Sequence, residues 1–103
     1  VIKTLKKGIN FLMDTQSKID LVCQNGAKVL KIKNQRYGDA VINPIQIFSK
    51  SDANNQVCNR LDDKLSRVKH SREIRKNDVF DVWGYLTLLM IEKGWMEFED
   101  LID

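Results

Sequence analysis

The amino-acid sequence predicts an all-α fold, a small bundle of four to five helices. Apolar residues recur every three or four positions along most of the chain, which is the spacing of amphipathic helices. The 103 residues include one proline and five glycines, too few for many short strands joined by turns. With 43% apolar and 30% charged residues, the composition is that of one globular domain, residues 1–103.

The first third of the chain is expected to form two helices. Residues 2–13 have a helical apolar spacing, and Asp14 or Thr15 would cap a second helix that continues to about Asn34. Asn25–Gly26 would otherwise form a turn that splits this second helix. Its apolar stripe contains Ile19, Val22, Cys23, Ala27 and Leu30.

A loop is expected over residues 35–43, followed by a single helical turn from Pro44, because proline suits the first position of a helix. This turn would carry Ile45 and Phe48 into the core. In the loop, Tyr37 would stack on a base, and Arg36 beside it is a candidate phosphate ligand. Alternatively, the loop is an ordinary turn in which Tyr37 closes the core of the domain.

Two longer helices follow. Ser51 is the expected cap of a helix over residues 52–69, and Asn77 of a helix that continues to about Lys93 and stops at Gly94. Their apolar stripes contain Val57, Cys58, Leu61, Leu65 and Val68 in the first, and Val79, Val82, Trp83, Leu86, Leu89 and Met90 in the second. The wide second face and the short chain predict a homo-oligomer, a dimer or higher, with sites near the subunit boundary.

The charge is unevenly distributed. Residues 1–37 hold eight basic and two acidic residues, whereas the tail from Glu92 holds five acidic and one basic, within a net charge of +3. The uneven charge would bind an anion, or it would let the oppositely charged ends of two copies attract each other. The third possibility is a solvated surface with neither role. The apolar residues of the tail predict another short packed helix; they are Trp95, Phe98, Leu101 and Ile102.

The chain lacks an apolar run long enough to span a membrane and lacks a signal-peptide pattern. Cys23 and Cys58 are expected to be buried free thiols in a reducing cytoplasm. A zinc site would need more ligands than these two residues and His70, the single histidine.

Charged residues follow the edges of the two longer helices. Arg60, Lys64 and Arg67 share one flank at i, i+4 and i+7, and would hold phosphates or form a solvated edge. Asp62 lies on the opposite flank of that helix. On the last long helix, Asp78, Asp81 and Tyr85 share a flank at i, i+3 and i+7. Two carboxylates one turn apart would share Mg²⁺. Alternatively, the helix dipole would stabilise them at the helix start, and they would pair with basic residues across the interface.

Three segments together resemble a known family: RYGDAVINPIQIFS, RLDDKLSRV and NDVFDVWGYLTLL. The family is the nucleotide-modification-associated domains found largely in phages, which are related to the MazG-like all-α nucleoside triphosphate pyrophosphohydrolases. The resemblance covers about residues 28–95. It implies a helical bundle that usually dimerises and binds Mg²⁺ between paired carboxylates, while water attacks the triphosphate to give a monophosphate and pyrophosphate.

The acidic pairs of these enzymes are only partly matched. Asp78-x-x-Asp81 matches the second pair, but Asn59-x-x-Asp62 and Arg60-x-x-Asp63 stand where the first pair is expected. An amide or a cation therefore replaces one acidic ligand. This departure favours direct phosphate binding over metal-dependent hydrolysis, because such hydrolysis needs carboxylates to hold the cations.

The sequence therefore predicts a phage-type nucleotide-binding domain in the cytoplasm of an infected bacterial host. As an enzyme it would use Asp62, Asp78 and Asp81 to hold Mg²⁺. As a binding protein it would sequester a nucleotide with its basic residues. The alternative is a non-enzymatic helical module that binds protein or nucleic acid through its basic N-terminal half.

Overall fold

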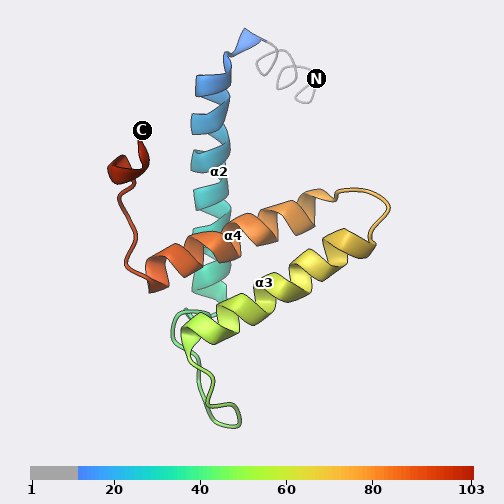
Figure 1. The fold of residues 1–103 in the computed structure, drawn as a ribbon, viewed down its shortest axis with the longest axis vertical. Helices are drawn as coiled ribbons and strands as arrows, with labels where there is room; N and C mark the ends of the chain where they lie inside the picture. The colour runs from blue at the N-terminus through green and yellow to red at the C-terminus, as the bar shows by residue number, and fades with distance from the viewer. Residues whose placement is uncertain (1–11) are drawn as a thin grey trace. The chain divides into compact units, whose positions relative to one another are not determined.

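The computed structural model describes residues 12–103, and this part of the chain is all-helical, as predicted (Figure 1). It contains α2 (Thr15–Arg36), α3 (Ala53–His70), α4 (Lys76–Glu92) and a short 3-10 helix, η1 (Glu99–Leu101). The helix expected over residues 2–13 falls mostly on residues 1–11 and so lies outside the described part. The chain divides into two compact units, Val1–Ile32 and Lys33–Asp103.

Helix α2 begins at Asp14, one of the two caps expected. The Asp14 carboxylate accepts a hydrogen bond of 2.8 Å from the amide of Ser17, which satisfies a donor that the first helical turn leaves free. The helix continues through Asn25–Gly26, so the alternative turn at this dipeptide does not form.

Helix α2 ends in a glycine-terminated motif. Gly38 has a φ of 61°, and its amide donates to the carbonyl of Gln35, while the amide of Asp39 donates to the carbonyl of Asn34. This pair of bonds satisfies the last free carbonyls of the helix. The Asp39 carboxylate then accepts from the side-chain amides of Asn34 at 3.0 Å and Asn43 at 2.7 Å, which fixes the start of the loop.

The helical turn expected from Pro44 does not form. Gln46 adopts a φ of 56° and reverses the chain, and its side chain closes the loop by donating to the carbonyl of Ser51 at 3.0 Å. Ile45 and Phe48 are consequently 82% and 100% exposed, so their predicted burial is wrong.

The starts of α3 and α4 differ from the predicted caps. Asp52, and not Ser51, caps α3, because its carboxylate accepts from the amide of Asn55 at 2.8 Å. Helix α4 begins directly after Arg75, whose side chain makes no capping bond, and Asn77 is already inside its first turn. Each helix therefore starts within two residues of the expected position.

Gly94 ends α4, as predicted. It has a φ of 75°, and its amide donates to the carbonyl of Ile91 while the amide of Trp95 donates to that of Met90. These bonds form the same motif that ends α2.

Helices α3 and α4 run side by side in opposite directions and enclose a small core (Figure 1). Val57 is fully buried at its centre, where burial of a valine side chain contributes about 1.5–3 kcal/mol. The core residues are Val41, Val57, Leu61 and Leu88, with Ile42, Val82, Tyr85 and Leu89 packed against them. Val41 and Ile42 come from the segment expected to be a loop, so this loop also contributes to the core.

The C-terminal tail is less packed than expected. A single 3-10 turn forms at Glu99–Leu101, but Trp95, Leu101 and Ile102 are 57%, 70% and 79% exposed. The predicted packing of the tail as a helix is therefore wrong. Both cysteines are free, but Cys23 is exposed and Cys58 only half-buried, so neither is the buried thiol that was expected. In the described part of the chain, no helix is long and apolar enough to cross a membrane.

Candidate functional site

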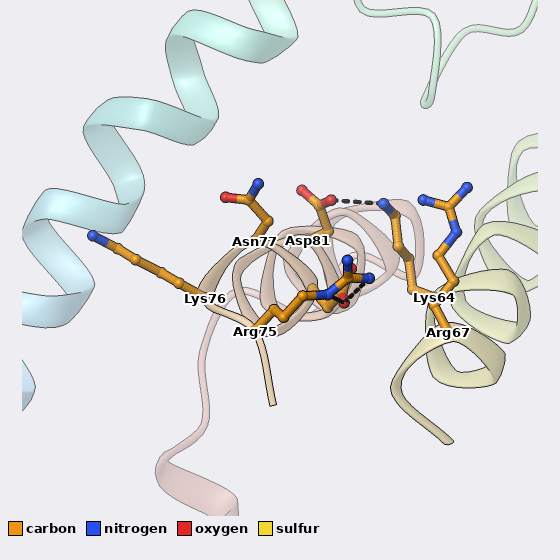
Figure 2. Close-up of a pocket in the computed structure, with 7 residues that line it drawn as sticks. Lys64, Arg67, Arg75, Lys76, Asn77 and Asp81 are labelled. Carbon is orange, nitrogen blue, oxygen red and sulfur yellow. Dashed lines mark hydrogen bonds and ion pairs between the residues drawn. The ribbon is translucent and has the colours of Figure 1, made fainter. Parts of the chain in front are cut away.

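A shallow charged pocket lies where the last turns of α3 meet the first turns of α4 (Figure 2). Its volume is about 440 Å³, in the range of small-ligand sites. Seven residues line it: Lys64, Arg67, Arg75, Lys76, Asn77, Asp78 and Asp81. Four of them are basic, two acidic and one an amide, so the pocket has a net charge of +2.

The floor of the pocket is an ion pair within the first turn of α4. The Arg75 guanidinium folds back onto Asp78, with its Nε and Nη2 at 2.9 and 2.8 Å from Oδ2. The Asp78 side chain is only 5% exposed, whereas that of Arg75 is 61% exposed. The carboxylate also lies at the positive end of the helix dipole. The negative charge of Asp78 is therefore balanced by the Arg75 guanidinium and by the helix dipole.

A second ion pair joins α4 to α3. Lys64 Nζ lies 2.8 Å from Asp81 Oδ2, and Lys33 Nζ lies 3.6 Å from the other oxygen of the same carboxylate. The Lys33 ammonium also lies over the ring of Phe80, 5.1 Å from its centroid. Asp81 thus holds two lysines, one at the end of α2 and one on α3.

Two cations of the pocket are left without a carboxylate. Over residues 12–103, no carboxylate lies within ion-pair distance of Arg67 or Lys76. Figure 2 shows the Arg67 guanidinium beside Lys64, one turn away on α3, whereas Lys76 extends to the opposite side. Arg67 is therefore the guanidinium best placed to meet an incoming anion, with its five donors uncompensated.

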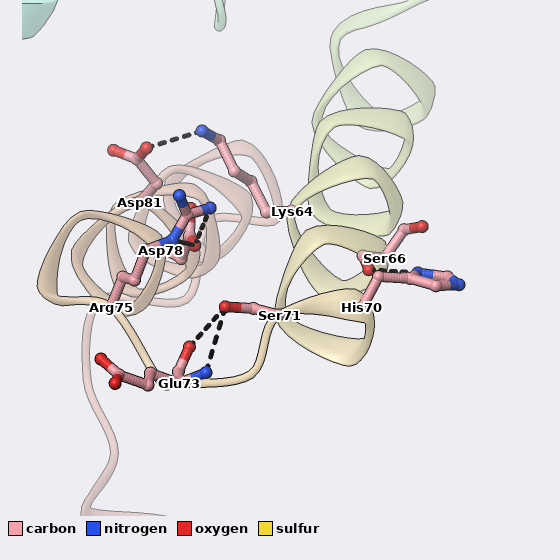
Figure 3. A network of polar contacts seen from close by, with 8 residues as sticks. All are labelled: Lys64, Ser66, His70, Ser71, Glu73, Arg75, Asp78 and Asp81. Atoms are coloured by element: carbon pink, nitrogen blue, oxygen red, sulfur yellow. Dashed lines mark hydrogen bonds and ion pairs between the residues drawn. The ribbon is translucent and has the colours of Figure 1, made fainter.

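A short connection between the helices precedes Arg75 and contains hydrogen bonds of its own (Figure 3). The Ser71 hydroxyl donates to the carbonyl of Glu73 at 2.6 Å and accepts from the Glu73 amide at 3.4 Å. On α3, His70 Nδ1 lies 2.8 Å from the carbonyl oxygen of Ser66 and so carries the hydrogen. One of these contacts lies within the last turn of α3 and the others within the connection that leads into α4.

The pocket contains four of the residues selected from the sequence. Lys64 and Arg67 were expected to bind phosphate, and Asp78 and Asp81 to bind metal. Five others do not line it: Arg36, Tyr37, Arg60, Asp62 and Tyr85. Tyr37 is 66% exposed, whereas Tyr85 packs against the core. Since Asp62 is absent from the lining, the predicted acidic trio does not gather there, and residues 12–103 contain no cluster of three or more metal-ligating side chains.

The sequence reasoning missed Arg75, Lys76 and Asn77. The signal was the basic run that directly precedes the last long helix, in the segment SREIRKN. A helix start exposes amides without intrahelical acceptors, so basic side chains at that point add to a local positive field.

Comparison of the chain with protein-family models, curated proteins and solved structures finds no match. The chemistry of the site therefore follows from its own residues. Donors dominate the pocket, and both of its carboxylates are already paired with cations. Such an arrangement can hold an anion by direct hydrogen bonds and charge.

Proposed function

We propose that this protein binds a nucleoside phosphate in the pocket between α3 and α4, through direct contacts from Lys64, Arg67 and Arg75, and does not hydrolyse it. The observation that carries this proposal is the positive pocket in which Arg67 has no carboxylate partner among residues 12–103. A phosphate oxyanion matches the planar donor fork of arginine and would complete its hydrogen bonds.

The pairing of the two carboxylates favours binding over metal-dependent hydrolysis. To bind Mg²⁺, Asp78 would have to leave Arg75, and Asp81 would have to leave Lys64 and Lys33. In addition, Mg²⁺ needs nearly octahedral oxygen ligands, and the pocket offers these two carboxylates among four cations. The expected role of Asp78 is to orient Arg75, whereas Asp81 holds Lys64, for which a bound phosphate would compete.

The nature of the ligand comes from the sequence. Residues 28–95 resemble phage-type nucleotide-handling domains related to MazG-like enzymes, so a nucleoside phosphate is the expected ligand. Sequestration of that nucleotide is the corresponding biological role. The pocket supports the phosphate-binding part of this proposal, because phosphate is the group that its donors fit.

Calorimetric titration with nucleoside triphosphates, with and without Mg²⁺, tests the proposal. We expect binding without metal, release of no pyrophosphate, and recovery of the intact nucleotide. Arg67→Glu should weaken binding at least tenfold, because it replaces the positive charge of the guanidinium with a negative charge. Arg60→Glu is the matched control, since Arg60 is an arginine on the same helix that does not line the pocket. Metal-dependent turnover that is lost in Asp81→Ala would establish the enzyme instead.

We also propose that the protein forms a dimer with the pocket near the subunit boundary. Helix α4 is apolar on the side that packs on α3 and also carries Val79 and Leu86, which are 51% and 44% exposed and seven residues apart. Basic Lys76 precedes this face and acidic Glu92 follows it, so two antiparallel copies would match opposite charges. Light scattering that shows a monomer at micromolar concentration would contradict this proposal.

A further inference from the structure

The lining of the pocket is unusual for a nucleotide site, because it contains no apolar or aromatic side chain. Most small-molecule pockets are lined mainly by apolar residues with a few polar groups that fix the orientation of the ligand. Proteins that distinguish bases stack them on aromatic rings and bond to their edges. Here six charged side chains and the amide of Asn77 make the whole lining.

The aromatic rings of the neighbouring segments do not line the pocket. The Phe80 ring is covered by the Lys33 ammonium at 5.1 Å and lies 5.7 Å from the ring of Trp83. Tyr85 packs against the core, and Tyr37 does not line the pocket. None of these rings therefore offers its face to a base bound among the basic residues.

A single hydrogen bond from Asn77 does not distinguish bases. Its amide both donates and accepts, so it can form a hydrogen bond with any base edge, a ribose hydroxyl or a phosphate oxygen. The basic residues donate only, and they match the oxygens of a phosphate chain. The Arg75 side chain at the pocket is 61% exposed, so a nucleoside attached to the phosphates would reach solvent.

From these observations we infer that the pocket recognises the phosphate chain alone and leaves the nucleoside outside. The ligand class is then a triphosphate chain, whichever base its nucleoside carries. This inference rests on the proposed function and narrows it. Inorganic tripolyphosphate should then bind as tightly as a nucleoside triphosphate, and nucleosides without phosphate should not bind.

The test is a calorimetric titration of the full chain at low salt with five triphosphate ligands and one nucleoside. The ligands are ATP, GTP, CTP, dTTP and inorganic tripolyphosphate, with adenosine as the nucleoside. We expect the five dissociation constants to agree within threefold, and adenosine to give no heat of binding. Arg67→Gln should weaken all five to the same degree, whereas Arg60→Gln should leave all five unchanged.

The two proposals fail in different ways. A preference of more than threefold for one base, or tripolyphosphate binding more than threefold weaker than every nucleotide, overturns the inference and leaves nucleotide binding standing. Binding of adenosine also overturns it. If none of the five triphosphates binds, the proposed function fails, and the inference fails with it.

Discussion

Lys64 Nζ lies 2.8 Å from Asp81 Oδ2, so the carboxylate on α4 holds one of the cations that an anionic ligand needs. The two side chains are 18% and 24% exposed, and a pair so partly buried is less screened by water and salt than a surface pair. A bound phosphate would therefore compete with Asp81 for Lys64. A metal ion would instead need the Asp81 carboxylate. The effect of removing that carboxylate therefore distinguishes a phosphate-binding site from a metal site.

The substitution Asp81→Asn should tighten phosphate binding. It removes a negative charge from the lining and releases Lys64 to the ligand. A charge at this depth is worth about 1 kcal/mol, which corresponds to a dissociation constant lower by roughly fivefold. Calorimetric titration with tripolyphosphate in the absence of divalent metal measures the change.

Asp63→Asn is the control for this substitution, because Asp63 is an exposed carboxylate on α3 that does not line the pocket. It should change the affinity by less than twofold. If Asp81→Asn instead weakens binding in the presence of Mg²⁺, the carboxylate holds a metal and the direct-binding proposal is wrong.

The substitution Arg75→Gln should destabilise the fold. It leaves the carboxylate of Asp78, whose side chain is 5% exposed, without its ion-pair partner. An unpaired buried carboxylate costs about 1–3 kcal/mol, and here the amides at the start of α4 moderate the loss. Urea denaturation followed by circular dichroism gives the change in the free energy of unfolding.

Arg72→Gln provides the comparison, since Arg72 is an exposed arginine in the same connection and has no ion pair within the described residues. Its effect should stay below about 0.5 kcal/mol. Equal losses in the two variants would mean that the Arg75–Asp78 pair contributes nothing to stability.

Val57→Ala should cost about 2–3 kcal/mol, because it removes two carbon atoms from the centre of the core and leaves a cavity. Val57 is fully buried between α3 and α4. Val79→Ala makes the same chemical change at a side chain that is 51% exposed and should cost less than 0.5 kcal/mol in the monomer. Urea denaturation at a protein concentration too low for association compares the two, and similar losses would contradict the assigned core.

Helical periodicity was sufficient to locate α3 and α4 and the flanks on which Lys64 and Asp81 meet. Positions at i, i+3, i+4 and i+7 share one side of a helix, so the residues that border the α3–α4 contact could be selected from spacing alone. Gly94 was equally predictable, because a helix that ends in a left-handed residue strongly favours glycine.

Arg75, which the sequence reasoning missed, lies in the site through a local i, i+3 contact with a buried partner. Arg75 enters the site because Asp78 is buried and draws the guanidinium back over the first turn of α4. Capping preference favoured Asn77 as the cap, but α4 begins at Lys76, directly after Arg75. Likewise, Phe48 is exposed in a loop where Gln46 adopts a φ of 56°, a conformation that is uncommon for residues other than glycine and that sequence patterns rarely reveal.

The cap of α2 gives a prediction about pH. Hydrogen bonds from Ser17 to the Asp14 carboxylate lower its pKa below the ordinary value of 3.8. Since the pKa is lower in the folded state, the charged cap stabilises the helix above about pH 3.8, and this stabilisation is lost as the pH falls through the lowered pKa. NMR titration of the Asp14 side-chain carboxyl carbon should therefore give a midpoint below 3.8.

The substitution Asp14→Ala should remove the stabilisation that the capping bond gives to α2. The amide of Ser17 loses its acceptor, so its hydrogen exchange at neutral pH should become faster in the variant than in the unchanged protein. Asp20→Ala removes a carboxylate from the interior of the same helix and leaves the cap intact, so it should not change exchange at Ser17. Because a general change in helix charge would act in both variants, a response confined to Asp14→Ala assigns the protection of the Ser17 amide to the capping bond.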